Sequence, residues 1–118
     1  NYLRNGLERF QTHIEFTETY RNTKPSWFGF PMTMKEDSPF TRLQLIEFLD
    51  KNKIGSRLLF AGNLLKQPYF KDIDYRVSGE LTNTDLTMNN TFWIGVQPYL
   101  EKEHLDYVIN KFEEFCIF

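Results

Sequence analysis

The feature that most constrains the fold is an apolar stripe near the end of the chain. From Glu101 onward, large apolar residues recur at spacings of three and four, which places them on one side of a helix. They are Leu105, Val108, Ile109, Phe112 and Phe115. A helix with one apolar face must cover that face against another element. The stripe therefore predicts a long amphipathic helix that packs on a sheet or on other helices.

Three more segments are predicted to be helical. Apolar residues recur at helical spacing over residues 2–14, among charged and amide side chains. A capping residue and a first-turn proline at 37–39 predict a helix that runs to about residue 52 and is stopped by Gly55. Asn83, Thr84 and Asp85 offer caps for a helix that ends near residue 92.

Three short apolar or aromatic segments, 27–34, 57–60 and 93–96, are predicted to be strands, and Gly29 in the first leaves room for a close neighbour. Residues 64–70 predict a helical turn or two. Short strands with unequal helical connections favour an α+β domain over a parallel doubly wound fold.

The 118 residues suffice for one domain. Because the chain begins at Asn1 without an apolar leader, we expect it to be a piece of a longer protein.

The composition excludes several classes of partner. Fourteen basic and sixteen acidic residues give a net charge of −2, with no basic cluster for nucleic acid. No segment approaches the length of a membrane span. The single cysteine, Cys116, excludes an internal disulfide and cannot form a metal site alone, which fits a reducing cytoplasm. Twelve Phe, six Tyr and two Trp are many for this size, so we expect one apolar face to lie against further protein.

Two segments place polar residues inside apolar runs: SRLLFAGNLLKQPYF at 56–70 and NTDLTMNNTFWIG at 83–95. They closely resemble the C-terminal domain of the DegT/DnrJ/EryC1/StrS branch of the fold-type I pyridoxal-phosphate (PLP) enzymes, which modify sugars. The wider family usually has proline, leucine and histidine where this chain has Ala61-Gly62-Asn63. The versions at 60–64 and 88–93 look like those of the sugar 3-dehydrase subfamily.

The resemblance implies a fold and a place in a larger enzyme. The fold is the small domain of fold-type I enzymes, a largely antiparallel sheet covered by helices. Residues 1–20 would form a linking helix and residues 26–118 the body of the small domain. The rest of the parent would be an N-terminal large domain, and the full-length protein a homodimer.

The resemblance also implies a function. The dehydrase subfamily uses pyridoxamine phosphate (PMP) and an iron–sulfur cluster to remove the C3 hydroxyl of CDP-4-keto-6-deoxyglucose, in 3,6-dideoxyhexose (O-antigen sugar) biosynthesis. A separate reductase supplies electrons. The PMP or PLP and the 2Fe-2S cluster would be bound mainly outside this chain, which alone would be inactive. Two alternatives stay open: a PLP-dependent nucleotide-sugar aminotransferase as the parent, or a stand-alone binding module.

Three residues are candidate substrate ligands. Arg57 begins an apolar strand, where its guanidinium binds substrate oxygens or pairs with a nearby carboxylate. Asn63 takes the place of the family histidine near the active-site mouth and keeps its hydrogen-bonding capacity. Asn90 either ends a helix or donates to a sugar. No catalytic residue and no metal ligand is expected in this chain.

Two aromatic and two histidine residues complete the set of candidates. Trp27 and Phe28 are able to stack on a base or sugar ring, but aromatic strand residues more often belong to the core. We expect core positions for both. His13 and His104, beside charged and amide neighbours, are expected to face solvent.

Overall fold

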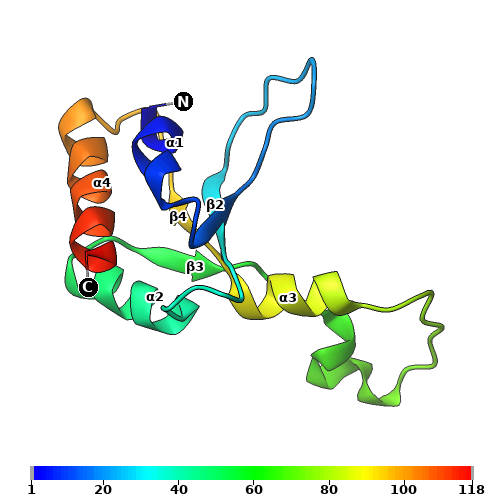
Figure 1. Cartoon of the computed structure of the whole chain (residues 1–118). Helices are drawn as coiled ribbons and strands as arrows, with labels where there is room; N and C mark the ends of the chain where they lie inside the picture. Colours follow the sequence, from blue (N-terminus) through cyan, green and yellow to red (C-terminus); the bar gives the residue numbers. More distant parts are fainter. Residues whose placement is uncertain (1, 118) are drawn as a thin grey trace.

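Four short strands form the central sheet of the protein, for which a computed structural model describes residues 2–117 (Figure 1). The sheet order is β1-β2-β4-β3, and each neighbouring pair is antiparallel. The strands are β1 (Ile14–Phe16), β2 (Gly29–Met34), β3 (Ser56–Leu58) and β4 (Thr91–Gly95). The predicted α+β class with an antiparallel sheet is therefore confirmed, and β1 is a strand that the sequence analysis did not predict.

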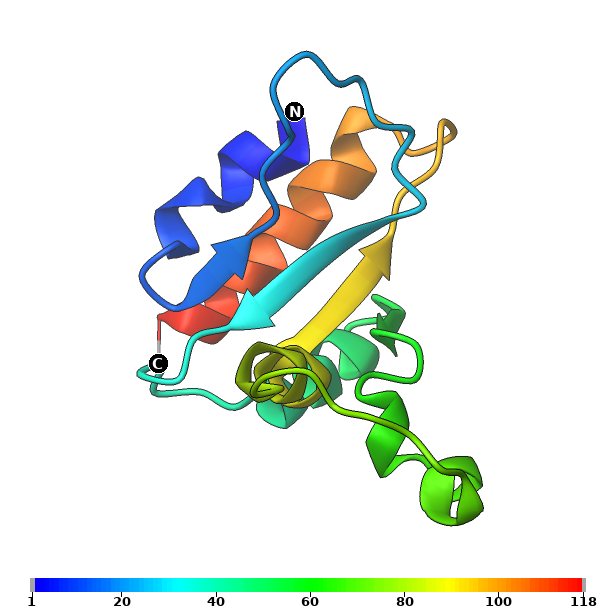
Figure 2. The same cartoon turned by 90° about the vertical axis from the view of Figure 1, so that its right-hand side faces the viewer.

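Helices cover one face of this sheet, and Figure 2 shows α1 and α4 side by side across it. The α-helices are α1 (Tyr2–Leu7), α2 (Arg42–Lys51), α3 (Thr82–Asn90) and α4 (Lys102–Cys116). Three 3-10 helices are η1 (Glu8–Phe10), η2 (Leu64–Lys66) and η3 (Pro68–Asp72). The helix predicted from the apolar stripe is α4, and Phe112 of that stripe is fully buried.

The core lies between the sheet and helices α1, α2 and α4. Side chains alternate between the two faces of a strand, and Met32, paired with Phe92, points toward the helices. The apolar side chains that fill this layer come from all three helices, from η1, from three strands and from the loop after α2. They are Leu3, Leu7, Phe10, Ile14, Phe16, Met32, Met34, Leu45, Leu49, Ile54, Phe92, Ile94, Ile109 and Phe112.

The helix predicted over residues 2–14 is too long, and the linking helix expected over residues 1–20 is wrong for the same reason. The chain leaves helical geometry after Phe10, and Ile14 pairs with Met34 in the sheet. Ile14 and Phe16 are buried while Glu15 is exposed, which is strand alternation. Ile14 satisfies the helical spacing and the strand pattern equally, so periodicity alone did not separate them.

The ends of two helices also differ from the prediction. Helix α2 begins after Thr41, whose side chain accepts from the Gln44 N–H while Gln44 bonds back to the Thr41 backbone. This capping box, and not the proline at 39, sets the start. Lys53, with a φ of 62°, ends α2 in place of Gly55. In α3, Leu81 stands at the N-cap without a side-chain bond, so the predicted caps at 83–85 are wrong.

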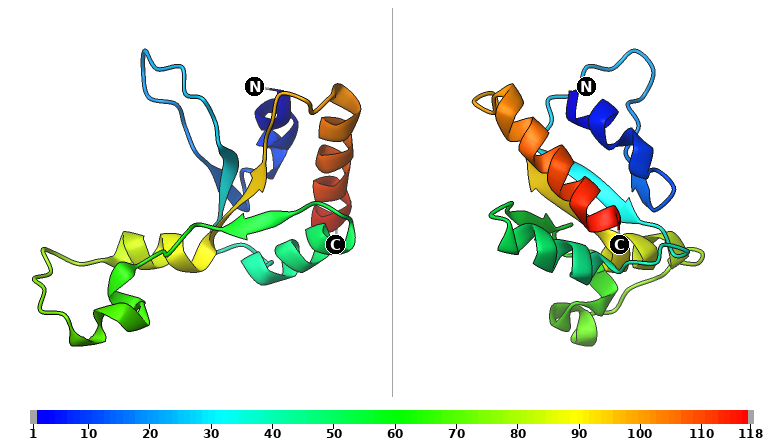
Figure 3. Two further views of the ribbon diagram at one scale, coloured as in Figure 1. Left: turned by 180° about the vertical axis from the view of Figure 1, so that it is seen from behind. Right: turned by 60° about the vertical axis from the view of Figure 1, so that its left-hand side comes forward.

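Residues 59–90, which include α3 and are here named the arm, project from the sheet (Figures 1 and 3). The Cα radius of gyration is 16.1 Å, against about 13 Å for a compact domain of this length. The loop between β1 and β2 projects on another side (Figure 1). Within residues 2–117, no helix has the length and hydropathy needed to cross a membrane.

Candidate functional site

The first of the two family-like segments forms a tight turn at the base of the arm. Phe60 and Gly62 have positive φ angles of 45° and 63°, and a bulky residue rarely enters that region. Gly62 lies against the side chain of Met88, with which a Cβ at position 62 would collide. Because Met88 belongs to the second family-like segment, the turn at 59–62 brings the two segments together.

Three polar side chains, Asn63, Lys66 and Asp85, join this turn to α3, and we name them the clip. Asn63 is only 4% exposed. Its Oδ1 accepts from the Leu65 N–H at 3.0 Å, and its Nδ2 donates to Asp85 Oδ1 at 2.8 Å. Lys66 Nζ lies 2.9 Å from the same oxygen. The hydrogen bond from Asn63 and then the contact with Lys66 lower the pKa of Asp85 below its usual value.

Arg42 of α2 holds the other end of α3. Its Nη1 donates to the carbonyl oxygens of Met88 at 2.7 Å and of Thr91 at 3.0 Å. Burial lowers the pKa of Arg42, but a guanidinium stays charged in proteins. Thr91 also shares a 2.8 Å hydroxyl hydrogen bond with Thr33 of β2. The junction between α3 and β4 is therefore tied both to a helix and to the sheet.

No hydrogen bond joins the three predicted ligands to one another within residues 2–117. Arg57 is exposed on β3, opposite Trp93, and its Nη1 donates to the Ser56 carbonyl oxygen at 2.9 Å. Asn90 is half-buried as the last residue of α3. Among residues 2–117, no hydrogen bond joins these side chains to Asn63, and no carboxylate pairs with Arg57. Their proposed contact with substrate stays a prediction.

Aromatic side chains gather on the sheet face that the helices leave open. Phe28 is 74% exposed and Phe60 77% exposed, with the ring of Trp93 between them at centroid distances of 5.1 and 6.5 Å. Trp27 is 46% exposed. The core positions expected for Trp27 and Phe28 are therefore wrong. Gly29 makes the room that the sequence analysis expected, because the Trp93 ring lies where its Cβ would be.

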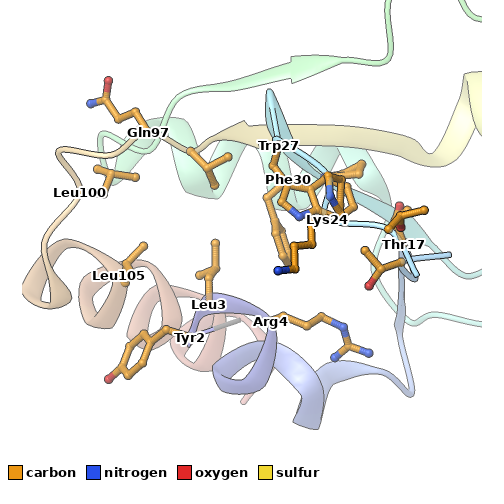
Figure 4. Close-up of a pocket in the computed structure, with 15 residues that line it drawn as sticks. Tyr2, Leu3, Arg4, Thr17, Lys24, Trp27, Phe30, Gln97, Leu100 and Leu105 are labelled. Carbon is orange, nitrogen blue, oxygen red and sulfur yellow. The ribbon is translucent and has the colours of Figure 1, made fainter. Parts of the chain in front are cut away.

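Two concave regions flank this aromatic group. A groove of about 470 Å³ lies between the turn at 59–62 and α3. A larger cavity of about 730 Å³ lies between α1, the β1–β2 loop and the start of α4. Figure 4 shows Arg4 and Lys24 at this cavity, with Trp27 and Phe30 on its far wall. None of the three predicted ligands lines either region.

The described residues do not fit a cofactor site of their own. Within residues 2–117, no three His, Cys, Asp or Glu side chains lie close enough to hold a metal ion. Burial raises the pKa of the Cys116 thiol to about 11, so the thiolate form that binds iron is disfavoured. His104 is exposed as expected, whereas His13 is half-buried with its ring edge-on to Phe40 at 5.8 Å.

Sequence reasoning missed the residues that hold the arm. Arg42, Lys66 and Asp85 act over separations of 19 to 49 positions, which no local pattern encodes. One signal was available: Thr41 and Gln44 have the spacing of a capping box, which would have placed Arg42 at the first position of a helix.

Relatives of this chain include a lipopolysaccharide biosynthesis protein and three sugar 3-dehydratases. It is 58% identical over 115 residues to the lipopolysaccharide biosynthesis protein RfbH of Salmonella typhimurium, covering 98% of this chain and 26% of that protein. It is 44% identical over 94 residues to the dTDP-4-dehydro-2,6-dideoxy-D-glucose 3-dehydratase of Saccharopolyspora spinosa, covering 80% and 20%. The chain thus spans about a quarter of the length of the relatives it matches.

Solved structures and a family model agree with this likeness. The GDP-4-keto-6-deoxy-D-mannose-3-dehydratase of E. coli, solved with hydrated PLP, superimposes with a TM-score of 0.83 at 26% identity, over 93% of this chain and 28% of that one. The model of the DegT/DnrJ/EryC1/StrS aminotransferase family matches residues 1–113. Because that match spans nearly the whole sequence, the chain belongs to the DegT/DnrJ/EryC1/StrS aminotransferase family.

Proposed function

We propose that this chain is the C-terminal domain of a nucleotide-sugar 3-dehydrase that uses PMP and a 2Fe-2S cluster to remove the C3 hydroxyl of CDP-4-keto-6-deoxyglucose. The main support is the 58% identity to a lipopolysaccharide biosynthesis protein. Further relatives carry the names of 3-dehydratases that act on dTDP- and GDP-sugars. The choice of CDP and of the cluster rests on the resemblance of the 60–64 and 88–93 motifs to the dehydrase subfamily.

In this proposal the chain binds and encloses the substrate, and the chemistry belongs to the rest of the parent. PMP supplies an amine for the 4-keto group and an electron sink for loss of the neighbouring hydroxyl. The parent would also contain a large N-terminal domain, form a homodimer, receive electrons from a reductase and lie in the cytoplasm. No catalytic step is assigned to a residue of this chain.

Arg57 and Asn90 are the proposed substrate ligands with free polar groups. The Arg57 guanidinium is exposed and uses one nitrogen on its own strand, which leaves donors for phosphate or hydroxyl oxygens. Asn90 lies half-buried beside the family-like motif. Asn63, the third predicted ligand, has its polar groups engaged within the chain.

The test uses the full-length parent with CDP-, GDP- and dTDP-4-keto-6-deoxyhexoses, in the presence of PMP and a reductase. We expect loss of the C3 oxygen from the CDP sugar by mass spectrometry, with iron and sulfide present in the purified protein. A glutamate-dependent gain of nitrogen on the sugar would instead assign the parent to the aminotransferases. Absence of iron from an active enzyme would remove the cluster from the proposal.

A pair of variants tests the proposed role of Arg57. Arg57→Lys should raise the KM for the nucleotide sugar, because an ammonium cannot make the forked contact of a guanidinium. Arg76→Lys is the matched control, since Arg76 is exposed in the loop at 73–81. Equal KM values for both variants would remove Arg57 from the substrate site.

A further inference from the structure

The groove between the turn at 59–62 and α3 has a lining of a particular chemistry. One wall is the turn itself, and the other consists of three side chains of α3, Asn83, Thr84 and Thr87. All three are neutral, and together they offer one amide and two hydroxyl groups. Neutral groups that both donate and accept hydrogen bonds match the hydroxyls of a sugar, whereas a phosphate would call for cationic side chains. The groove is therefore suited to the sugar part of a ligand.

The clip connects the two walls of this groove. Asn63 directly follows the turn, and Asp85 lies on α3 between Thr84 and Thr87. The 2.8 Å hydrogen bond between Asn63 and Asp85 therefore joins one wall to the other. Asn63 is one of two polar side chains among the buried residues, and its oxygen also fixes the start of η2. Because Asn63 is buried, leaving its amide group without a partner is costly.

Further contacts support this arrangement, one between the walls and one within the wall formed by the turn. Gly62 touches Met88 on α3, and Gln67 donates from Nε2 to the Ala61 carbonyl oxygen at 2.7 Å. The turn also keeps Phe60 in a backbone conformation that is unfavourable for a bulky residue. Such a conformation persists only when the surrounding contacts hold it. The clip provides such contacts at the end of the turn, where Asn63 bonds both to Leu65 and to Asp85.

We propose that the clip sets the width of this groove and that Asn63 and Asp85 are positioning residues for the sugar of the nucleotide-sugar substrate. This inference rests on the proposed function. Asn63 acts through the turn and α3 and does not touch the substrate. The sugar binds against Asn83, Thr84 and Thr87, with Phe60 at the rim.

An exchange of the two side chains tests the proposal in the full-length enzyme. Asn63→Asp alone places two carboxylates within about 3 Å of each other and should push the walls apart. Asp85→Asn alone removes the partner of Lys66. The double variant carries a carboxylate at 63 and an amide at 85, which restores the pair in reverse. We expect the KM for the nucleotide sugar to rise roughly tenfold in Asn63→Asp and to return most of the way in the double variant, with kcat little changed.

Asp106→Asn is the matched control, because Asp106 pairs with Lys102 at 2.6 Å on α4, outside both walls of the groove. It should leave the KM unchanged. Failure of the double variant to recover KM, with a normal melting temperature, would show that Asn63 contacts the substrate itself. A lowered melting temperature with unchanged KM in Asn63→Asp would reduce the clip to a scaffold contact. Either result overturns the proposal.

A second measurement covers the case in which Asn63→Asp does not fold. Asp85→Asn keeps the volume of the side chain and should increase amide hydrogen exchange in the turn and in α3 without changing exchange in α4. Unchanged exchange in the turn would contradict the proposal.

If the wild-type parent transaminates instead of dehydrating, the proposed reaction fails. The KM comparison among the variants still tests the clip, because it requires only turnover of a nucleotide sugar.

Discussion

The body of the domain and the arm are held together by different physical means. Among the described residues, all fourteen buried apolar side chains lie in the body, outside residues 59–90. Among residues 59–90, all of which the structure describes, Asn63 is the one buried residue, and its side chain is polar. Arg42 ties the arm to the body, and inside the arm the clip and the contact between Gly62 and Met88 join the turn to α3. The body thus depends on hydrophobic burial and the arm on a few polar contacts.

This difference places parts of both family-like motifs in the region that is held by fewer contacts. Net contributions of single hydrogen bonds are about 1 kcal/mol, so an arm held by a few of them opens at much lower cost than the core. Both family-like motifs begin or end in the arm. Segments that bind ligands are commonly drawn from such regions of low local stability, because they have to adjust.

The largest loss in the free energy of unfolding is expected from a substitution in the body. Phe112→Ala removes a fully buried ring from α4 and should lower the free energy of unfolding by about 3–5 kcal/mol. Phe60→Ala, which truncates a 77% exposed ring in the arm, should change it by less than about 0.5 kcal/mol. Urea unfolding of the purified chain measures both. Similar losses for the two variants would refute the division between body and arm.

Arg42→Gln should have the next largest effect, because it withdraws the donors from the Met88 and Thr91 carbonyl oxygens. We expect a loss of about 2 kcal/mol, with faster hydrogen exchange in α3 than in α4. Arg9→Gln provides the comparison: Arg9 pairs with Glu113 at an exposed position, and such pairs contribute about 0–1 kcal/mol. Uniform acceleration across the chain would mean that Arg42 stabilises the whole fold instead of the arm.

Gly62→Ala should cost slightly less, about 1–2 kcal/mol, for the left-handed backbone at this position, together with displacement of Met88. Gly79→Ala is the control for backbone strain alone, since Gly79 has a φ of 74° and no atom near its would-be Cβ. The difference in melting temperature between the two variants isolates the contact with Met88. Equal melting temperatures for the two variants would mean that the contact between Gly62 and Met88 of α3 does not affect stability.

The smallest effect is a loosening of the arm in acid. The pKa of Asp85 is lowered in the folded chain, below an unfolded value of about 3.9. Ionised Asp85 therefore stabilises the arm above about pH 4, and this contribution is lost as the pH falls through the lower, folded pKa. Hydrogen exchange of the turn between pH 6 and pH 3 should show the change in the wild type and not in Asp85→Asn. Asp106→Asn, in the body, should behave like the wild type.

The sequence predicted most elements of the body and of the arm, where the helical turns at 64–70 and the helix ending near 92 correspond to η2, η3 and α3, but it did not predict the contacts that hold the arm. The apolar stripe indicated α4 because α4 packs on the core along one face, and the strands at 27–34, 57–60 and 93–96 are found within one or two residues of β2, β3 and β4. The helix predicted over residues 2–14 was too long because Ile14 fits both the helical and the strand periodicity. Asn63 was singled out correctly as unusual. Its partner Asp85 lies 22 positions away, beyond any local pattern.

The sequence by itself determined most of the secondary structure, with β1 as the main exception, the α+β class and, through two motifs, the family. These follow from local propensity and from the spacing of apolar residues, which are properties of neighbouring positions. Only the tertiary structure decided that Trp27 and Phe28 are exposed, that Asn63 bonds to Asp85, and that Arg42 holds the end of α3. Those outcomes depend on which distant segments meet, and a hydrogen bond between two such segments leaves no periodic trace in the chain.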